Sequence, residues 1–301
     1  MAHKVFIDGE AGTTGLQIRE RLTPRTDIEL VQLDPARRKD PEARREALAA
    51  ARIAILCLPD AAAKEAVALA EGLDVRFIDA STAHRVADGW VFGFPELAPG
   101  APEAIAAAPR VSNPGCYSTG AIALAAPLVA AGLVAPDEIA SINAVSGYTG
   151  GGKELIAEMQ AEGAPDHFVY ALGQGHKHLP EIIRHSGLTR RPVFAPSVGQ
   201  FAQGMVVQIP LQLEGRRLAD LREALARHYE GARFVKVVEA EARVVPTILN
   251  DTNEMRLSVH GSDENGCAVL VAVLDNLGKG ASGAAVQNLN LMIGADEGAG
   301  L

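Results

Sequence analysis

Four short apolar runs alternate with helix-forming stretches at the start of the chain, and this alternation restricts the fold more than any other feature. The runs occupy 5–7, 28–33, 53–58 and 75–79, and helical patterns lie between them at 16–22, 41–51 and 60–71. Unbroken apolar runs indicate strands buried on both faces, as in a parallel sheet with helices on either side. The first third of the chain is therefore predicted to be an open α/β sheet.

The first run leads directly into a glycine-rich turn, Asp-Gly-Glu-Ala-Gly-Thr-Thr-Gly at 8–15, and then into a helix. Strand, glycine turn and helix in this order are typical of a dinucleotide site, because glycines let main-chain N–H groups and a helix N-terminus approach a pyrophosphate. The spacing G-x-x-G-x-x-G differs from the commoner G-x-G-x-x-G, so an ordinary strand-to-helix turn is the alternative. The predicted cofactor-binding residues here are Gly9, Gly12, Thr13, Thr14 and Gly15.

Basic residues follow the second apolar run, where a dinucleotide-binding fold meets the adenosine ribose. Asp34 precedes Arg37, Arg38 and Lys39. A carboxylate at this place favours NAD, whereas cations favour the 2′-phosphate of NADP. Three cations against one carboxylate favour NADP, with Arg37 and Arg38 as the phosphate ligands, and a solvated loop is the alternative.

Residues 79–85 begin where the fourth run ends, at the carboxyl edge where ligands bind in such sheets. Ser81 and Thr82 are candidate cofactor contacts. Arg85 is a candidate partner for an anionic group of the substrate, since a guanidinium can bind such a group with two parallel hydrogen bonds. A surface arginine that binds nothing is the alternative.

Cys116 is the candidate nucleophile. It follows the tight-turn sequence Asn-Pro-Gly at 113–115 and precedes a helix-forming stretch at 119–126. Unpaired N–H groups and the helix dipole at a helix start favour the thiolate, which is the reactive form of cysteine. The alternative is a small apolar residue that fills the end of a helix. Cys57 lies inside the third apolar run and is expected in the core.

The pattern changes after Cys116, where strands arrive with fewer helices between them. The predicted strands are 139–145, 193–198, 205–213, 234–238, 255–260 and 267–274. This spacing favours an α+β domain with a mainly antiparallel sheet and helices on one face. A small-residue helix at 284–293 is expected to return to the first domain, with 294–301 as a loose tail. The turn before this helix would then lie beside the cofactor, with Asn276, Lys279 and Gly280 as contacts.

The predicted domains are therefore 1–115 with 280–301 for the dinucleotide, and 116–279 for catalysis and oligomerisation. The second domain holds a pair of histidines, His176 and His178, shortly before Glu181. No further ligands at metal-site spacing accompany the pair, so no metal is predicted. An imidazole exchanges protons near neutral pH, which favours an acid/base role, and Glu181 is a candidate to hold one ring in its tautomer. These residues alone do not decide between the two histidines.

Composition excludes several kinds of partner. The net charge of −9 and the pI near 5.4 argue against nucleic acid or an anionic membrane surface. Three widely spaced cysteines do not form a disulfide framework, which favours a reducing, cytoplasmic compartment. Uninterrupted apolar runs fall short of the ~20 residues that a membrane helix needs. The chain is expected to be soluble.

Five stretches together resemble the N-acetyl-gamma-glutamyl-phosphate reductase family, in its shorter subclass. They are 5–17, 79–85, 112–117, 176–181 and 275–283, and they extend from the first strand to the last helix. The cysteine and C-terminal stretches are shared with the wider semialdehyde dehydrogenase group, which includes aspartate-semialdehyde dehydrogenase. Ser118 departs from the pattern of many relatives, which carry proline after the Cys-Tyr pair.

The resemblance implies a Rossmann-like domain and an NADP-dependent enzyme of arginine biosynthesis. It would reduce the acyl phosphate N-acetyl-gamma-glutamyl phosphate to N-acetylglutamate semialdehyde through a thioester on Cys116. The resemblance further implies His176 as the base, Asn113 and Arg85 as phosphate contacts, and a homodimer or homotetramer. The alternatives are another acyl-phosphate reductase of the aspartate-semialdehyde type, or a dinucleotide-binding protein in which Cys116 is inert.

Overall fold

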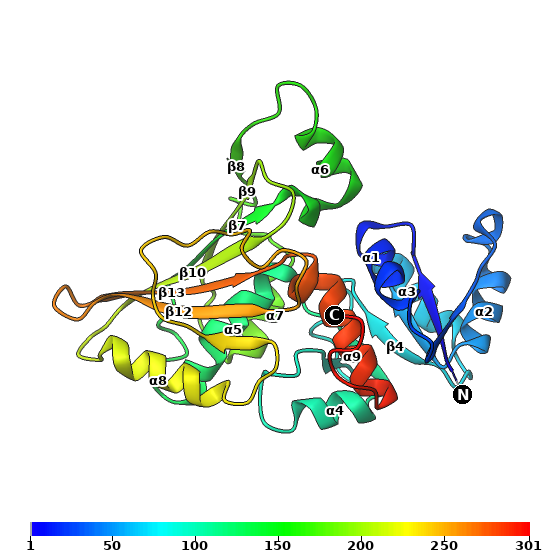
Figure 1. Ribbon diagram of the computed structural model, residues 1–301, viewed down its shortest axis with the longest axis horizontal. Coiled ribbons are helices and arrows are strands. Elements are labelled where there is room, and N and C mark those ends of the chain that lie inside the picture. The colour runs from blue at the N-terminus through cyan, green and yellow to red at the C-terminus, as the bar shows by residue number, and fades with distance from the viewer. Residues whose placement is uncertain (1) are drawn as a thin grey trace. The chain divides into compact units, whose positions relative to one another are not determined.

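The computed structural model describes residues 2–301 and divides into two compact units (Figure 1). Unit 1 comprises the chain up to Pro95, Gly100–Pro114 and Ala281–Leu301, and unit 2 comprises Glu96–Pro99 and Gly115–Gly280. The second domain was predicted at 116–279, so each of its two boundaries differs from that of unit 2 by one residue. Glu96–Pro99 was predicted to lie in the first domain. The dinucleotide and substrate roles of the two parts stay predictions.

Unit 1 is an α/β sheet with helices on both faces, as predicted. Within residues 2–301 its six strands have the order β2-β1-β3-β4-β6-β5 and pair in parallel. The strands are β1 (His3–Asp8), β2 (Ile28–Val31), β3 (Ile53–Leu56), β4 (Arg76–Asp79), β5 (Val91–Phe92) and β6 (Arg110–Ser112). The helices are α1 (Thr13–Leu22), α2 (Pro41–Ala50), α3 (Asp60–Leu69), α4 (Ala101–Ala107) and α9 (Gly283–Ile293).

Alternate side chains of the central strands enter two separate cores. Val5 and Ile7 pack with residues of α1, α4 and α9, whereas Phe6 packs with residues of α2 and α3. Successive side chains of a strand point to opposite faces, so a strand in the middle of this sheet must be apolar at every position. The prediction that the last helix returns to the first domain is confirmed, since α9 belongs to unit 1.

The loose tail predicted at 294–301 is wrong. Asn290 Nδ2 donates to the carbonyls of Glu297 and Ala299, and Leu301 packs against the core beside α9. Arg25 Nη1 donates to Asn290 Oδ1 (2.5 Å) and to the carbonyl of Ala299 (3.3 Å). Tertiary hydrogen bonds from α9 and from the loop after α1 therefore order a polar, glycine-rich end that carries no helix or strand pattern.

The glycine-rich turn between β1 and α1 needs glycine at two of its three glycine positions. Gly9 has φ +93°, and the carbonyl of Cys57 occupies the place where a Cβ would lie. A Cβ on Gly15 would meet Gly9 O at 2.5 Å and Glu10 Cα at 2.8 Å. Gly12 precedes the first residue of α1, and its nearest neighbour to such a Cβ is 3.5 Å away. Gly9 and Gly15 let the helix start pack closely on β1 and β3.

Replacing Gly15 with alanine is expected to lower the free energy of unfolding by about 1–3 kcal/mol, because two backbone atoms must shift. Gly12→Ala is the matched control, and it should stay within about 0.5 kcal/mol of the wild type, since the stiffer unfolded chain offsets a poorer N-cap. Urea unfolding followed by circular dichroism measures both. Equal losses in the two variants would contradict the packing argument.

Unit 2 contains a mixed sheet of seven strands within residues 2–301, in the order β11-β12-β13-β10-β7-β9-β8. The strands are β7 (Ser141–Gly147), β8 (His167–Val169), β9 (Val193–Gly199), β10 (Met205–Gln212), β11 (Val235–Val237), β12 (Met255–Ser262) and β13 (Cys267–Leu274). Neighbours pair antiparallel except β7 with β9 and β11 with β12. The mainly antiparallel sheet is thus confirmed.

Helix α5 (Cys116–Ala130) lies under this sheet, beside α7 (Leu179–Ser186) and α8 (Leu218–His228), as Figure 1 shows. Most of its side chains are buried, which explains its almost uniformly small and apolar sequence. Helix α6 (Gly152–Met159) and strand β8 belong to an excursion of the chain between β7 and β9.

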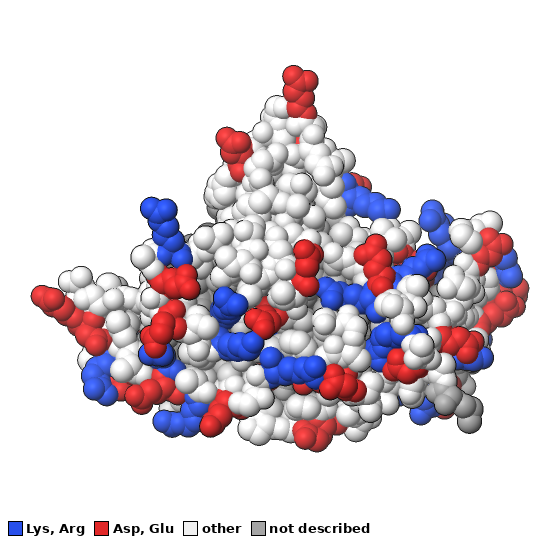
Figure 2. Space-filling view, viewed as in Figure 1, with Lys and Arg blue, Asp and Glu red and all other residues white. Residues whose placement is uncertain are grey.

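Two further observations concern surface charge and the length of the helices. On the face drawn in Figure 2, acidic and basic side chains are interspersed. Of the helices in residues 2–301, none combines the length and the apolar character that crossing a bilayer requires.

Candidate active site

Cys116 is the first residue of α5, where the sequence predicts it. The N-cap is Gly115, which has extended dihedral angles and offers the helix end no side chain. Ser118 Oγ and Thr119 Oγ1 both donate to Gly115 O, at 3.0 and 2.9 Å, and hold the residue before Cys116 in place. The Cys116 side chain is half-buried. Main-chain N–H groups at this helix start favour negative charge on sulfur or on an oxygen bound nearby.

Both predicted histidines lie beside the start of this helix, within unit 2. Tyr117 follows Cys116, and its ring centroid is 5.8 Å from that of His176 and 5.9 Å from that of His178. Phe194 of β9 packs edge-on against both His176 and Tyr117. The aromatic residues therefore hold the imidazoles next to the cysteine-bearing turn of α5.

Hydrogen bonds determine the tautomer of His176. The main-chain N–H of His178 donates to His176 Nδ1 at 3.1 Å, so the neutral ring carries its proton on Nε2. The other ring nitrogen, Nε2, lies 3.2 Å from Tyr170 Oη. His176 is therefore arranged to donate a proton or a hydrogen bond from Nε2. His178 is more deeply buried and is the N-cap residue of α7.

Two tyrosines near Cys116 were missed by the sequence analysis. Burial raises the pKa of Tyr170 to about 12, a hydrogen bond with Tyr117 opposes this, and negative charge on Cys116 adds to it. Burial also raises the pKa of Tyr117, with smaller contributions from Tyr170 and Cys116. Both phenols stay protonated at neutral pH. Tyr170 precedes the histidine pair in an irregular segment, and no spacing rule in the sequence marks it.

Glu181 contacts the turn that presents Cys116. It lies in the first turn of α7, is almost fully buried, and its Oε2 accepts a hydrogen bond from Gly115 N at 3.2 Å. The bond joins α7 to the residue immediately before the nucleophile. Its predicted action on a histidine tautomer stays a prediction.

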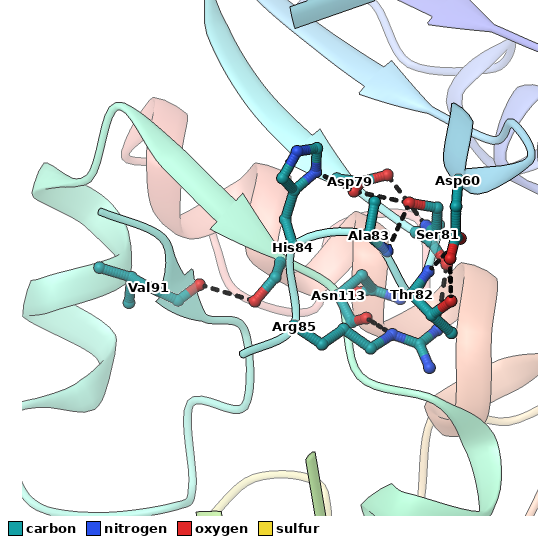
Figure 3. A network of polar contacts seen from close by, with 11 residues as sticks. Asp60, Asp79, Ser81, Thr82, Ala83, His84, Arg85, Val91 and Asn113 are labelled. Atoms are coloured by element: carbon teal, nitrogen blue, oxygen red, sulfur yellow. Dashed lines mark hydrogen bonds and ion pairs between the residues drawn. The ribbon is translucent and has the colours of Figure 1, made fainter. Parts of the chain in front are cut away.

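A polar network in unit 1 holds the predicted 79–85 segment (Figure 3). Asp79 is fully buried and accepts from Ser81 N, Ser81 Oγ and His84 Nδ1, at 2.9, 2.8 and 2.6 Å. Thr82 donates through its main-chain N and its Oγ1 to Asp60, the first residue of α3. The His84 ring stacks on Trp90 with centroids 4.1 Å apart. The hydroxyls of Ser81 and Thr82 thus shape this loop, and their cofactor role stays a prediction.

Arg85 and Asn113 lie together in the same network. Arg85 donates from Nε to the Asn113 carbonyl and from Nη2 to the Ala80 carbonyl, both at 3.0 Å (Figure 3). The side chain of Asn113 bonds at both ends, donating to Ala281 O at 2.9 Å and accepting from Asn288 Nδ2 at 3.1 Å. Asn113 therefore orients the guanidinium through its backbone and connects the loop to α9.

The glycine turn fits a dinucleotide. Gly9 and Gly15 have no space for a side chain, and α1 begins after Gly12 with Thr13 and Thr14 and carries no acidic residue in its first turn. Asp34 caps the short helix Pro35–Arg37 by accepting from Ala36 N. Arg37 donates to Asp40 Oδ2 from Nε and Nη2, and this partner raises the pKa of Arg37. Arg38 is exposed.

The predicted 276–280 turn lies against Cys116 inside unit 2. Asn276 accepts from Gly204 N at 2.8 Å and donates to Thr149 Oγ1 at 3.0 Å. A Cβ on Gly280 would meet Cys116 Cβ at 2.8 Å. Lys279 is fully buried and forms an ion pair with Glu96. The predicted contact of this turn with a cofactor stays a prediction.

The other cysteines have different surroundings. Cys57 packs against the core of unit 1, where burial, with added repulsion from Asp79 and Asp8, raises its pKa to about 12. Cys267 is exposed at the start of β13. In the described part of the chain, residues 2–301, no group of three or more His, Cys, Asp or Glu side chains could hold a metal ion.

Comparison with known proteins identifies the family. The model of the semialdehyde dehydrogenase dimerisation domain matches residues 116–276. An N-acetyl-gamma-glutamyl-phosphate reductase from Brucella ovis is 54% identical over 98% of this chain and 100% of the relative. The chain belongs to the N-acetyl-gamma-glutamyl-phosphate reductase family. The reductase of Brucella canis matches with the same identity and coverage.

Solved structures show that this reductase family member has the fold of semialdehyde dehydrogenases. Aspartate semialdehyde dehydrogenase II from Vibrio cholerae, complexed with ASA, superposes with a TM-score of 0.72 and 16% identity, over 97% of this chain and 98% of that one. The enzyme with NADP from Candida albicans superposes with a TM-score of 0.67 and 13% identity, over 97% and 99%. The predicted fold class is confirmed. Because the relatives are reductases, membership of this family identifies the protein as an oxidoreductase.

Proposed function

We propose that this protein reduces N-acetyl-gamma-glutamyl phosphate to N-acetylglutamate semialdehyde and phosphate, with NADPH, in arginine biosynthesis. The observation that supports this most directly is 54% identity along almost the whole chain to reductases named for this substrate. The placement of Cys116 at a helix start beside two imidazoles supplies the chemistry that such a reaction needs.

Cys116 is the proposed nucleophile. Its thiolate attacks the acyl carbon, the carbon–oxygen bond to phosphate breaks, and a thioester forms on the sulfur. The departing phosphate takes up the one proton that the overall reaction consumes. N–H groups at the start of α5 stabilise the oxyanion that precedes this departure. When bound, NADPH supplies the hydride that reduces the thioester carbon.

His176 is the proposed acid/base residue. Its Nε2–H can hydrogen-bond the oxygen that becomes negative in both the attack and the reduction steps. Collapse of the thiohemiacetal then releases the aldehyde and returns Cys116 to the thiolate. Tyr170 orients Nε2 through its hydroxyl, and Glu181 holds the Gly115 N–H that precedes the nucleophile. His178 contributes the main-chain N–H that selects the tautomer of His176.

Arg85 is the proposed phosphate ligand of the substrate. Hydrogen bonds to two main-chain carbonyls hold its guanidinium, so it binds an anion with little further loss of side-chain entropy. Asn113 acts by holding Arg85 in this position. For the cofactor, the turn at Gly9, Gly12 and Gly15 would hold the pyrophosphate, with Thr13 and Thr14 at the start of α1.

Arg38 is proposed to select NADP over NAD. Arg38 is exposed. The guanidinium of Arg37 donates to Asp40, and the carboxylate of Asp34 accepts from Ala36 N. Replacing Arg38 with alanine is expected to raise the KM for NADPH about tenfold or more, because one charge-assisted hydrogen bond contributes roughly 1.5–3 kcal/mol. The KM for NADH should change less than about threefold, and Arg37→Ala should have the smaller effect on NADPH. Initial-rate kinetics with both coenzymes measure this, and equal losses for both would refute the assignment.

The protein is also proposed to be a cytoplasmic homo-oligomer, a dimer or a tetramer. A dimerisation-domain model matches 116–276, which supports self-association through unit 2. Sedimentation equilibrium distinguishes these states from a monomer.

Mass spectrometry of the intact protein tests the proposed reaction. Mixing with N-acetyl-gamma-glutamyl phosphate without NADPH should leave an N-acetylglutamyl adduct on Cys116. In the reverse direction, phosphate-dependent reduction of NADP should be much faster with N-acetylglutamate semialdehyde than with aspartate semialdehyde. A preference for aspartate semialdehyde would assign the protein to the other substrate, and failure with both would leave a non-catalytic dinucleotide-binding protein.

A further inference from the structure

Lys279 is one of the most deeply buried side chains in the protein. Its Nζ lies 2.7 Å from Glu96 Oε1 and 2.8 Å from Glu96 Oε2, and the two side chains are 1% and 5% exposed. Two charges taken out of water cost several kcal/mol, which a close and fully formed pair must offset. Apolar side chains of similar volume would fill the same space without this desolvation cost. Stability alone therefore does not account for the pair.

Other groups of unit 2 hold both partners. Lys279 Nζ lies 5.7 Å from the ring centroid of Phe234, within range of a cation–π interaction. The carbonyl of Glu96 is 3.1 Å from His228 Nε2, at the end of α8. Glu96–Pro99 belongs to unit 2 although the chain on either side belongs to unit 1. The short Glu96 segment is therefore anchored where it can receive Lys279.

Lys279 lies at the centre of a turn that is anchored on its other side as well. Asp275 accepts hydrogen bonds from Gln203 Nε2, Asp251 N and Leu277 N, at 2.6, 2.9 and 3.0 Å. Gly278–Ser282 forms one turn of π-helix, and Gly280 N donates to Asp275 O at 2.9 Å. Short π-helical turns of this kind are frequent at functional sites.

The turn contacts the nucleophile through Gly280. A Cβ there would lie 2.8 Å from Cys116 Cβ and 3.3 Å from Cys116 Cα, so the glycine backbone packs directly on that residue. Any shift of the 278–280 backbone therefore changes the space around the Cys116 side chain. Lys279, next to Gly280, is the residue of this turn whose side chain is held by a buried ion pair.

We propose that Lys279 and Glu96 are positioning residues for Cys116: their ion pair holds the 278–280 backbone against the nucleophile and restricts its sulfur to the orientation that the start of α5 stabilises. Lys279 acts in this way through Gly280, which packs on Cys116. The kinetic part of the test rests on the proposed function, whereas the labelling part does not.

The experiment compares Glu96→Gln, Lys279→Met and the double variant with the wild type. Each single variant is expected to lower kcat about tenfold or more with KM changed less than about threefold, because small misplacements of a reacting group have large effects on rate. Iodoacetamide labelling of Cys116 at pH 7, followed by peptide mass spectrometry, should slow at least about threefold. The double variant should be no worse than the poorer single variant, since both act through one pair.

Glu138→Gln is the matched control, because Glu138 and Arg216 form a less buried ion pair in unit 2. It should lower the melting temperature without slowing Cys116 labelling or kcat. The double variant buries no unpaired charge. If the single variants unfold, kcat and Cys116 labelling are therefore measured on the double variant. Folded variants with kcat and labelling within twofold of the wild type would overturn the proposal, as would effects that multiply in the double variant. If the wild type shows no reductase activity, the proposed function fails while the labelling result still decides this inference.

Discussion

Replacing Cys116 with serine is expected to lower kcat for acyl-phosphate reduction by at least about 10³-fold. A serine hydroxyl stays protonated at the start of α5, where a thiol can ionise, and an alkoxide is a much poorer leaving group than a thiolate when the aldehyde is released. Single replacements of catalytic nucleophiles have effects of this size or greater. Stopped-flow measurement of NADPH oxidation with N-acetyl-gamma-glutamyl phosphate gives the rate.

Cys267→Ser is the control for this substitution, because Cys267 is exposed at the start of β13. It should leave kcat within about twofold of the wild type. Intact-mass analysis should show an acyl adduct in this control and none in Cys116→Ser. An adduct that persists in Cys116→Ser at the wild-type level would identify a different nucleophile.

Replacing His176 with asparagine is expected to lower kcat about 10²- to 10⁴-fold, the usual contribution of a positioned acid or base. Asparagine Oδ1 can still accept the N–H of His178 that now bonds to Nδ1, so the local backbone keeps its hydrogen bond. The amide cannot transfer a proton. The pH profile of kcat should lose the ionisation that belongs to the imidazole, which a purely structural defect would leave in place.

Two companion variants show whether the effect belongs to His176. Tyr170→Phe removes only the hydroxyl at 3.2 Å from Nε2, and a loss of about tenfold in kcat is expected. His178→Asn keeps the main-chain N–H that bonds to His176 and should lower kcat less than His176→Asn does. A greater loss in His178→Asn, together with an altered pH profile, would transfer the acid/base role to His178.

Local patterns predicted much of this protein. The apolar runs of unit 1 appear as parallel strands, and the turn with Gly9 and Gly15 leads into α1. Cys116 begins a helix. These features depend on hydrogen bonds and steric limits among residues close in the chain, so short windows of sequence record them. Strand β8 and helices α6 and α8 of unit 2 were not predicted, because they are short or amphipathic. The buried residues of α8 are Leu221 and Leu225, which leave only a weak apolar pattern in the sequence.

Local sequence patterns did not predict which side chains contact one another at the site. Nothing in the sequence near Lys279 indicates Glu96, and nothing near His176 marks Tyr170 as its neighbour. The tail at 294–301 has the composition of a loose end, yet α9 and Arg25 hold it in place. Each of these contacts joins elements whose proximity depends on how the sheets and helices pack.

The sequence by itself determined which site features occur and in what order along the chain. A glycine turn follows the first strand, a cysteine stands at a helix start, and a histidine pair comes after it. Only the tertiary structure decided which tautomer His176 adopts, that Asn113 is held at both ends of its side chain, and that Lys279 is paired with a buried carboxylate beside the turn on Cys116. The physical reason is that burial and pairing are properties of packed surfaces. A residue's type limits the bonds it can make, and the fold selects the partner.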